Sequence, residues 1–450
     1  MDISIIETSG LGDRSYLISH GGSAVVIDPQ RDIDRVLALA DEHATRITHV
    51  LETHLHNDYV TGGLELSHTV GAEYVVPAVD GIGYPHRAVT DGDVIDAGAM
   101  QLAVLHTPGH THHHVSYVLR EDTGAVHGVF TGGSMLFGTT GRTDLVAAED
   151  TEELTHAQFH SVRRLADSLP TDTPVYPTHG FGSFCSATPA SGDESTIGEQ
   201  RQSNPALTQD EQSYVDELLA GLSAYPTYYA HMGVINREGP APVDLTPPAP
   251  IDPAELRRRI EAGEWVVDLR NRTAFAAGHL QGTLGFELSG SFVSYFGWLY
   301  EWGAPVTLIG DSPDQIAEAK RELVRIGVDR LTGSATGDVD TLRDAAPLGS
   351  YEVSDFAGLA HERKTAAVAV LDVRQTNEFD QEHIPGAVSI PLHELPQRLD
   401  DVPAGPVWVH CASGYRSSIA ASYLDRAGIS VVLIDDDFDN AVKLGLTVSG

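Results

Sequence analysis

The second half of the chain contains one segment twice. Residues 266–283 (VVDLRNRTAFAAGHLQGT) and 370–387 (VLDVRQTNEFDQEHIPGA) share an Asp-x-Arg and then a Phe, a His and a Gly at the same spacing. Each copy has the pattern of strand, loop, helix and strand, followed by a further strand, loop and helix. Because parallel strands are joined through helices, the repeat predicts two small α/β domains with parallel sheets, over residues 252–335 and 352–450.

The residues before the repeat predict one further domain. Short β-rich runs such as SAVVID alternate with helix-like stretches such as DIDRVLALADEHA as far as about residue 240. The segment REGPAPVDLTPPAPIDP follows, and its prolines favour a stiff, extended connector. We therefore expect an α/β domain over residues 1–240, which makes a multidomain α/β protein of three domains, and 450 residues are enough for all three.

Composition excludes several kinds of partner. A formal net charge of −36 would repel nucleic acid and anionic membranes. No apolar run reaches the length of about 18 residues that spans a bilayer, and no secretion signal follows Met1, so we expect a cytoplasmic protein. Cys185 and Cys411 are the two cysteines of the sequence, which excludes a disulfide framework. We expect a homo-oligomer.

Histidines follow three β-rich runs of the first domain. The segment THLHNDYVTGG (53–63) places His54, His56 and Asp58 at alternate positions, where side chains of an extended chain share one face. The segments TPGHT and YPTHGFGS add His110 and His179. Imidazole groups bind zinc or iron, and three protein ligands with an open position are typical of a catalytic metal site. The sequence therefore predicts one divalent metal, iron or zinc.

These segments, together with GRTDL (141–145), resemble the motifs of the metallo-β-lactamase superfamily, and within it those of persulfide dioxygenases and hydroxyacylglutathione hydrolases. The resemblance covers about the first 240 residues. It implies an αββα sandwich with the metal at one sheet edge.

The chain departs from that family pattern at two positions. Tyr59 stands where the signature has a second histidine, and Gly133, in FTGGS, stands where the family has an aspartate. That aspartate bridges two metals in the hydrolases and completes the iron site of the dioxygenases, so its loss implies a single metal. The candidate ligands are His54, His56 and His110, with Asp58 and His179 as further members of the set. Tyr59 is expected to pack or to form a hydrogen bond beside the site.

Two more residues of this domain have alternative roles. Arg142, placed near the sheet edge by the resemblance, would bind a substrate carboxylate or would pair with Asp144. Cys185 would reach the pocket or would be an inert core residue.

The last domain has a cysteine in an activating position. In VWVHCASGYRSSIAASYL (407–424), a β-rich run ends at His410, a polar loop follows, and a helix is expected to begin near Ser417. Amides turned toward the sulfur and the positive end of a helix favour the thiolate. Arg416 closes the loop and would hold an anionic donor. The amides expected to surround the Cys411 sulfur are those of Ala412, Ser413, Gly414 and Tyr415.

The motifs LDVR, EHIPGA and CASGYRS resemble those of rhodanese sulfurtransferases, across residues 352–450. Cysteine phosphatases share the His-Cys start but have five residues between cysteine and arginine, whereas this chain has four, and the smaller loop suits a single sulfur atom. The resemblance implies a persulfide on Cys411. At the matching positions the first copy has Asp311 and Ile316, so residues 252–335 are expected to form a rhodanese-like domain that lacks the catalytic cysteine.

The order of the domains resembles that of bacterial fusions of a persulfide dioxygenase with a sulfurtransferase. It implies an enzyme of sulfur metabolism that acts on a low-molecular-weight thiol persulfide, with thiosulfate or a thiol as a further donor or acceptor. Two alternatives stay open. The first domain would be a zinc-dependent thioesterase that cleaves a thioester such as an acylglutathione, or a non-catalytic module that docks substrate for an active rhodanese domain.

Overall fold

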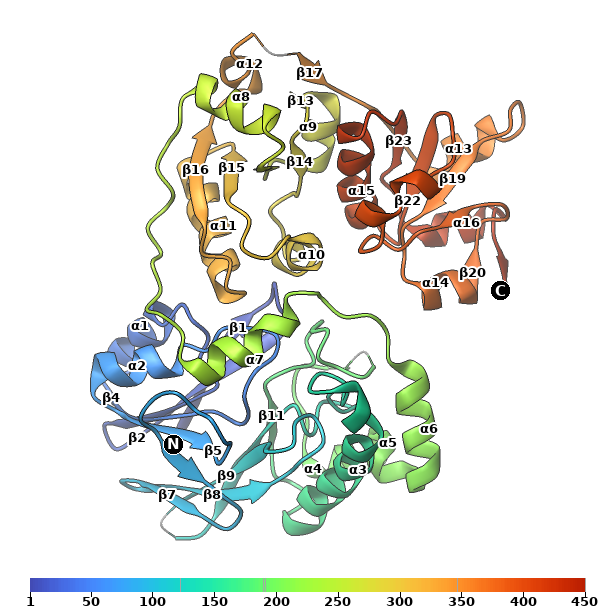
Figure 1. The fold of residues 1–450 in the computed structure, drawn as a ribbon. Helices are drawn as coiled ribbons and strands as arrows, with labels where there is room; N and C mark the ends of the chain where they lie inside the picture. The colour runs from blue at the N-terminus through green and yellow to red at the C-terminus, as the bar shows by residue number, and fades with distance from the viewer. Residues whose placement is uncertain (122, 189, 191, 346, 450) are drawn as a thin grey trace. The chain divides into compact units, whose positions relative to one another are not determined.

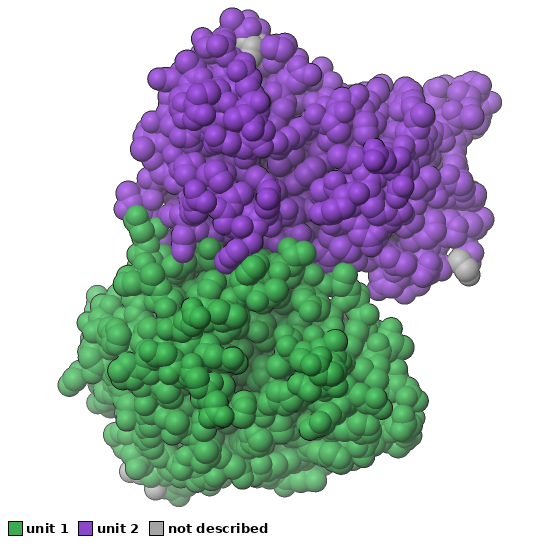
Figure 2. All heavy atoms as spheres, viewed as in Figure 1, with its two compact units in different colours: residues 1–244, 324–327 green, residues 245–323, 328–450 purple. Residues whose placement is uncertain are grey.

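The structure of the protein is a computed structural model that describes residues 1–121, 123–188, 190, 192–345 and 347–449. The chain divides into two compact units, shown in Figure 2: residues 1–244 with 324–327, and residues 245–323 with 328–450. Both copies of the repeat lie in the second unit. The finer division into three domains stays a prediction. No described helix is long and apolar enough to cross a membrane.

The described part of the first unit has two β-sheets (Figure 1). The first has the order β1-β2-β3-β4-β5-β6, with bounds β1 (Asp2–Thr8), β2 (Asp13–His20), β3 (Ser23–Ile27), β4 (Arg46–Leu51), β5 (Glu73–Pro77) and β6 (Arg87–Val89). The second has the order β11-β10-β9-β8-β7, with bounds β7 (Val94–Ala97), β8 (Met100–His106), β9 (Val115–Glu121), β10 (Val126–Gly132) and β11 (Val175–Pro177).

Alternation of apolar residues places these sheets face to face. In β3, Val25 and Ile27 enter a core that also contains residues of β8, β9 and β10, whereas Ala24 and Val26 enter a second core with the first helices. A third core packs helices on the outer face of the second sheet. The helices are α1 (Asp34–Glu42), α2 (Gly63–Val70), α3 (Thr151–Ser168), α4 (Ile197–Ser203), α5 (Pro205–Thr208), α6 (Glu211–Gly221) and α7 (Tyr229–Glu238). The layers are therefore helix, sheet, sheet and helix, which confirms the αββα expectation.

The second unit has two parallel sheets within its described residues. The first has the order β14-β12-β15-β16, with β12 (Trp265–Asp268), β14 (Leu284–Gly285), β15 (Val306–Gly310) and β16 (Leu331–Thr336). The second has the order β18-β23-β22-β19-β21, with β18 (Glu352–Ser354), β19 (Ala369–Asp372), β21 (Val388–Ser389), β22 (Val407–His410) and β23 (Val431–Ile434). Two short antiparallel pairs join β13 (His279–Leu280) to β17 (Leu348–Gly349) and β20 (Glu382–His383) to β24 (Val448–Ser449).

Helices connect and cover these parallel sheets. They are α8 (Pro253–Glu261), α9 (Arg272–Ala277), α10 (Phe292–Leu299), α11 (Pro313–Arg325), α12 (Val339–Leu342), α13 (Phe356–Glu362), α14 (Thr376–Gln381), α15 (Tyr415–Arg426) and α16 (Phe438–Lys443). Parallel strands joined through helices are what the repeat predicts, so the α/β class of this half is confirmed.

The matched residues of the repeat make the same contacts in both copies. Arg270 pairs with Asp268, and Arg374 pairs with Asp372, each at 2.7 Å. The histidine rings stack in the same way, with 4.0 Å between the centroids of Phe275 and His279 and 4.2 Å between those of Phe379 and His383. The spacing shared by the two copies therefore corresponds to one local structure that occurs twice in the chain.

Candidate functional site

The four candidate ligand histidines of the first unit lie in loops that follow its strands. His54 and His56 follow β4, His110 follows β8, and His179 follows β11. All four side chains are buried. Loops at strand ends thus bring together residues that are up to 125 positions apart in the sequence.

Three imidazoles converge among the described residues. His54, His110 and His179 each offer a ring nitrogen, and these nitrogens lie within 4.8 Å of one another. His54 Nε2 is 3.3 Å from His179 Nε2, and His110 Nε2 is buried without a hydrogen-bond partner in the described chain. Zinc and iron bind to converging imidazole nitrogens of this kind, so this set fits a divalent metal.

Partners on Nδ1 orient the rings of His110 and His179. The carbonyl of Arg142 lies 2.7 Å from His110 Nδ1. Because a carbonyl only accepts, Nδ1 carries the proton and Nε2 keeps its lone pair. His179 Nδ1 lies 2.9 Å from Asp13 and 3.1 Å from Asp58, so it likewise donates to carboxylates. His110 Nε2 is therefore available as a ligand, and His179 Nε2 becomes available when a metal displaces its proton.

His54 is oriented through Thr53. Its Nδ1 is 2.9 Å from Thr53 Oγ1, and that hydroxyl donates to Asp28 at 2.7 Å. Since the Thr53 proton is used by Asp28, the oxygen accepts from His54 Nδ1, and His54 Nε2 also keeps its lone pair.

His56 lies beside this convergence, and its Nδ1 is buried without a hydrogen-bond partner in the described chain. The set anticipated from the sequence, His54 with His56 and His110, does not form such a group among the described residues. His56 forms one group with Asp58 and His179, and another with Asp28 and Glu52.

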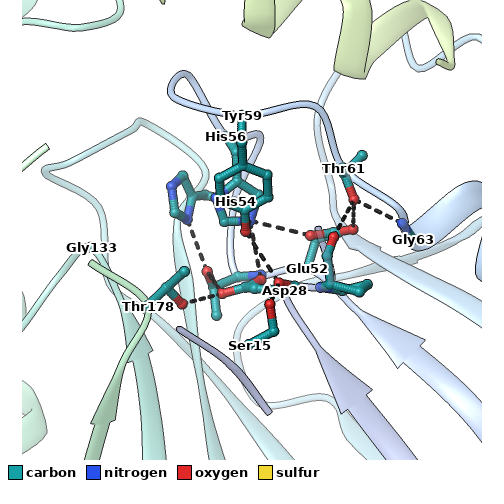
Figure 3. Close-up of polar contacts among 12 residues, drawn as sticks. Ser15, Asp28, Glu52, His54, His56, Tyr59, Thr61, Gly63, Gly133 and Thr178 are labelled. Carbon is teal, nitrogen blue, oxygen red and sulfur yellow. Dashed lines mark hydrogen bonds and ion pairs between the residues drawn. The ribbon is translucent and has the colours of Figure 1, made fainter. Parts of the chain in front are cut away.

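Acidic partners surround His56 (Figure 3). Its Nε2 is 3.2 Å from both Asp28 and Glu52. The Tyr59 hydroxyl lies 3.0 Å from the same nitrogen, and the Tyr59 ring stacks on the imidazole with 4.3 Å between centroids. Burial alone would lower the pKa of His56, but the two carboxylates outweigh it and raise the pKa to about 9. Tyr59 thus packs and forms a hydrogen bond beside the site.

Asp28 connects two of the loops through hydrogen bonds, and no sequence motif predicted this role. It accepts hydrogen bonds from the amide of Thr53 at 2.7 Å and from the hydroxyl of Thr178 at 2.5 Å (Figure 3). Burial would raise its pKa, but His56 and these hydrogen bonds lower it. Its place at the end of the buried run SAVVID was the signal available in the sequence. Glu52 has the same position after β4, and Asp13 is the first residue of β2.

Burial and charge set the other pKa values of the cluster. Burial lowers the pKa of His110 to about 3. Burial would also lower the pKa of His179, but Asp58 and Asp13 raise it to about 10. Burial raises the pKa of Asp13 to about 7, with the charge of Asp58 acting in the same direction. The Asp13 and Asp58 carboxylates therefore form, with His179, a strongly coupled group behind the converging nitrogens.

Gly133 leaves the space that the His110 ring occupies. A β-carbon at Gly133 would overlap the carbon and nitrogen atoms of that ring. The Gly133 amide also donates to His114 Nε2 at 3.0 Å. The His110 ring can therefore occupy this position only because residue 133 is a glycine.

A cavity of about 570 Å³ lies next to the histidine loops. Leu55 and Asn57, on either side of His56, line it, as do Thr111, which follows His110, and Tyr229. This volume falls within the range of small-molecule sites.

Arg142 and Cys185 are both buried. The Arg142 guanidinium binds Asp144 through two nitrogens, each at 2.7 Å, and donates to the carbonyl of Ser223 at 2.6 Å. The ion pair is thus formed, and binding of a substrate carboxylate by Arg142 stays a prediction. Cys185 Sγ lies 3.8 Å from the Tyr229 hydroxyl, and burial raises the pKa of this thiol well above its usual value.

The cysteine loop of the second unit lies between β22 and α15. The helix begins at Tyr415, two residues before the expected Ser417, because Gly414 at φ +90° provides the turn that starts it. Asp435 occupies the space where a Gly414 side chain would lie. The buried Cys411 Sγ is 3.4 Å from Ser417 Oγ. Within the described chain, the loop amides of Ala412, Ser413 and Gly414 donate no hydrogen bond.

Arg416 lies beside this loop and is already paired. Its two terminal nitrogens contact the two carboxylate oxygens of Glu378 at 2.6 and 2.8 Å. Burial would lower the pKa of Arg416, but this ion pair raises it.

Comparisons with known proteins agree with this architecture. Residues 11–179 match the metallo-beta-lactamase superfamily, and residues 355–443 match the rhodanese-like domain. The mitochondrial persulfide dioxygenase ETHE1 of Homo sapiens is 30% identical over 249 residues, which are 55% of this chain and 84% of that protein. The hydroxyacylglutathione hydrolase of Methylobacillus flagellatus is 33% identical over 169 residues, which are 37% of this chain and 61% of that protein.

One solved structure is similar over most of the chain. The crystal structure of a metallo-beta-lactamase from Staphylococcus aureus has a TM-score of 0.67 and 30% identity, and the match covers 75% of this chain and 99% of that one.

Proposed function

We propose a function from the following premise: the chain belongs to the metallo-beta-lactamase superfamily, and a rhodanese-like domain follows that fold in the sequence. On this premise, the protein is a sulfur-metabolism enzyme with two chemistries. The first unit handles a low-molecular-weight thiol persulfide with a divalent metal, in the manner of a persulfide dioxygenase. The second transfers sulfane sulfur through a persulfide on Cys411.

The convergence of His54, His110 and His179 carries the first part of this proposal. A bound iron or zinc ion would supply Lewis-acid or redox chemistry at this point. The protein's own groups hold the ligands in place: Asp13 and Asp58 fix His179, and the carbonyl of Arg142 fixes His110. The neighbouring cavity admits a small thiol compound.

The cysteine loop supports the second part. The Cys411 thiolate attacks the outer sulfur of a persulfide R–S–S–H, a new S–S bond forms to Cys411, and the donor S–S bond breaks. R–S⁻ leaves with the electron pair, and the transferred sulfur stays on Cys411 as a persulfide. The amides of Ala412, Ser413 and Gly414, which donate no hydrogen bond within the described chain, would stabilise the negative sulfur. A thiol acceptor takes the sulfur by the same exchange.

Oxygen uptake with glutathione persulfide tests the first activity. We expect uptake in protein loaded with iron and its loss in His110→Ala. Uptake that persists in metal-free protein would contradict the assignment. Cys411→Ser should abolish sulfur transfer while oxygen uptake continues, and retained transfer would refute the role of Cys411.

A hydrolytic function is the second candidate, and a specific observation favours it. The converging ligands are all imidazoles, which is a pattern of catalytic zinc sites. One relative, from Methylobacillus flagellatus, is a hydroxyacylglutathione hydrolase. Cleavage of an acylglutathione thioester by the zinc-loaded protein, without oxygen uptake, would select this function. If the protein binds no metal and shows neither activity, a docking role for the first unit is left.

Several finer assignments belong to the proposal as well. Residues 252–335 form a non-catalytic rhodanese-like domain with Asp311 in the cysteine position. Arg142 is kept as a candidate for substrate binding. A cytoplasmic location and a homo-oligomeric state rest on the sequence. The donor to Cys411 is a persulfide or thiosulfate.

A further inference from the structure

The charge that would attract an anion to the Cys411 loop is already neutralised. Glu378 holds Arg416 through a two-pronged ion pair with N–O distances of 2.6 and 2.8 Å. The Arg416 side chain is only 11% exposed. The Glu378 side chain is 30% exposed, so the guanidinium is the more buried partner, and the two-pronged geometry makes the pair strong.

Glu378 is fixed by its own backbone surroundings. It is the third residue of α14, and its Oε2 accepts from the Gln375 amide at 2.9 Å in a capping box. Burial would raise the pKa of Glu378, but its bonds to Arg416 and to this amide lower it. The carboxylate therefore stays ionised and stays in place at neutral pH.

The repeat supplies an internal comparison. The residue that matches Glu378 in the first copy is Ala274, 104 positions earlier, which is the same offset that relates Asp372 to Asp268. The first copy also lacks the arginine, because Ile316 stands in the place of Arg416. The carboxylate and the guanidinium are thus present together in the copy with the cysteine and absent together from the other.

Aromatic residues reduce solvent screening around the loop. Tyr295, from α10 of the first copy, packs against Tyr415 with 5.8 Å between ring centroids. The Tyr415 hydroxyl donates to the carbonyl of Glu287 at 2.7 Å. Charges near Cys411 therefore interact through partly dry surroundings, where their effects are larger than in water.

The charge balance of the loop discriminates between donors. Because the charges of Arg416 and Glu378 cancel, the reactive Cys411 thiolate gives the loop one net negative charge. Thiosulfate brings two negative charges and releases sulfite, which is also a dianion, so an unpaired cation is needed to compensate them. The reacting sulfurs of R–S–S–H carry no charge.

We propose that Glu378 is a specificity-determining residue: by neutralising Arg416, it sets the Cys411 loop to take sulfane sulfur from a persulfide and to disfavour thiosulfate. This inference rests on the proposed sulfur transfer through Cys411. Glu378 acts through Arg416 and is thus a positioning residue.

Single-turnover loading of Cys411 tests the inference in the full-length protein. Glutathione persulfide or thiosulfate is added without oxygen, and the gain of one sulfur atom is followed by mass spectrometry. We expect the wild type to load at least about 100-fold faster from the persulfide. Glu378→Gln should raise the rate from thiosulfate about 10-fold and change the rate from persulfide less than about 3-fold. Glu378→Asp, which keeps the charge, should preserve the preference for persulfide.

A matched control removes an ion pair elsewhere in the same domain. Glu394→Gln breaks the surface pair with Arg398, at 2.7 Å, and should leave both loading rates unchanged. Equal loading of the wild type from both donors would overturn the inference. So would equal losses with both donors in Glu378→Gln, which would show a purely structural role. Failure of both donors to load Cys411 would instead refute the proposed sulfur transfer itself.

Discussion

Gly133→Asp would restore the residue of the family pattern, and we expect it to remove metal binding. A β-carbon at Gly133 overlaps the His110 ring, so that ring has to move. Its movement breaks the 2.7 Å hydrogen bond between His110 Nδ1 and the carbonyl of Arg142. One of the three converging nitrogens is then lost, while His54 and His179 stay in place.

The size of the effect follows from two contributions. Overpacking a close-packed site costs about 1–3 kcal/mol, and a buried carbonyl left without its hydrogen bond costs about 1–3 kcal/mol more. For a domain of this size, 1 kcal/mol lowers the melting temperature by about 2–4 °C, so a cost of about 2–6 kcal/mol should lower the melting temperature of the first unit by roughly 4–24 °C. Loss of a ligand should weaken metal binding by at least about 100-fold, more than the loss of a ligand's hydrogen-bond partner does.

Elemental analysis and scanning calorimetry of Gly133→Asp and Gly133→Ala provide the assay. The alanine variant adds the overlapping atom without a charge, so it should lose metal and stability to a similar degree. If Gly133→Asp bound metal more tightly than the wild type at an unchanged melting temperature, the steric reasoning would be wrong.

Three further changes probe other parts of the molecule. Tyr59→Phe removes a buried hydroxyl that contacts His56, so we expect a loss of about 1 kcal/mol in unfolding free energy and an unchanged metal content by elemental analysis. Gly414→Ala places a residue with a side chain in the left-handed region and brings its β-carbon against Asp435. The substitution should lower the unfolding free energy by about 1–2 kcal/mol through backbone strain alone and should slow the loading of sulfur onto Cys411. Loading at the normal rate would contradict the assigned turn. Burial lowers the pKa of His410 below its usual value of about 6.5, so only the unfolded chain gains this proton as the pH falls through that value, and stability decreases on acidification. Denaturant unfolding of His410→Gln should show a weaker decrease between pH 6.5 and 5 than the wild type, and an equal decrease would assign the effect to other groups.

Local patterns in the sequence were sufficient for most of the fold. The matched Asp-x-Arg, Phe and His of the repeat predicted two α/β segments with parallel sheets. The structure shows the same ion pair and ring stacking in both copies. These contacts join residues within a few positions of one another, so the spacing alone specifies them. The αββα sandwich came from the resemblance, and strand alternation, as in Val25 and Val26, accounts for it.

The candidate site was less accessible to sequence reasoning. Alternation along THLHND correctly brought His54 near His56, whose ring centroids are 4.1 Å apart. Alternation does not specify which ring nitrogen faces which neighbour. Asp28 and Glu52, which follow different strands, engage His56 Nε2, and the nitrogens of His54 and His110 converge with that of His179.

The sequence by itself determined the chemical inventory of this protein: which imidazoles, carboxylates and thiols are present, and which strand or helix carries each. Only the tertiary structure decided how they pair. Glu378 neutralises Arg416 across 38 positions, and the His110 ring fills the space over Gly133. The physical reason is that ion pairs and steric overlap depend on distances of a few ångströms between distant segments, and one-dimensional spacing does not fix those distances.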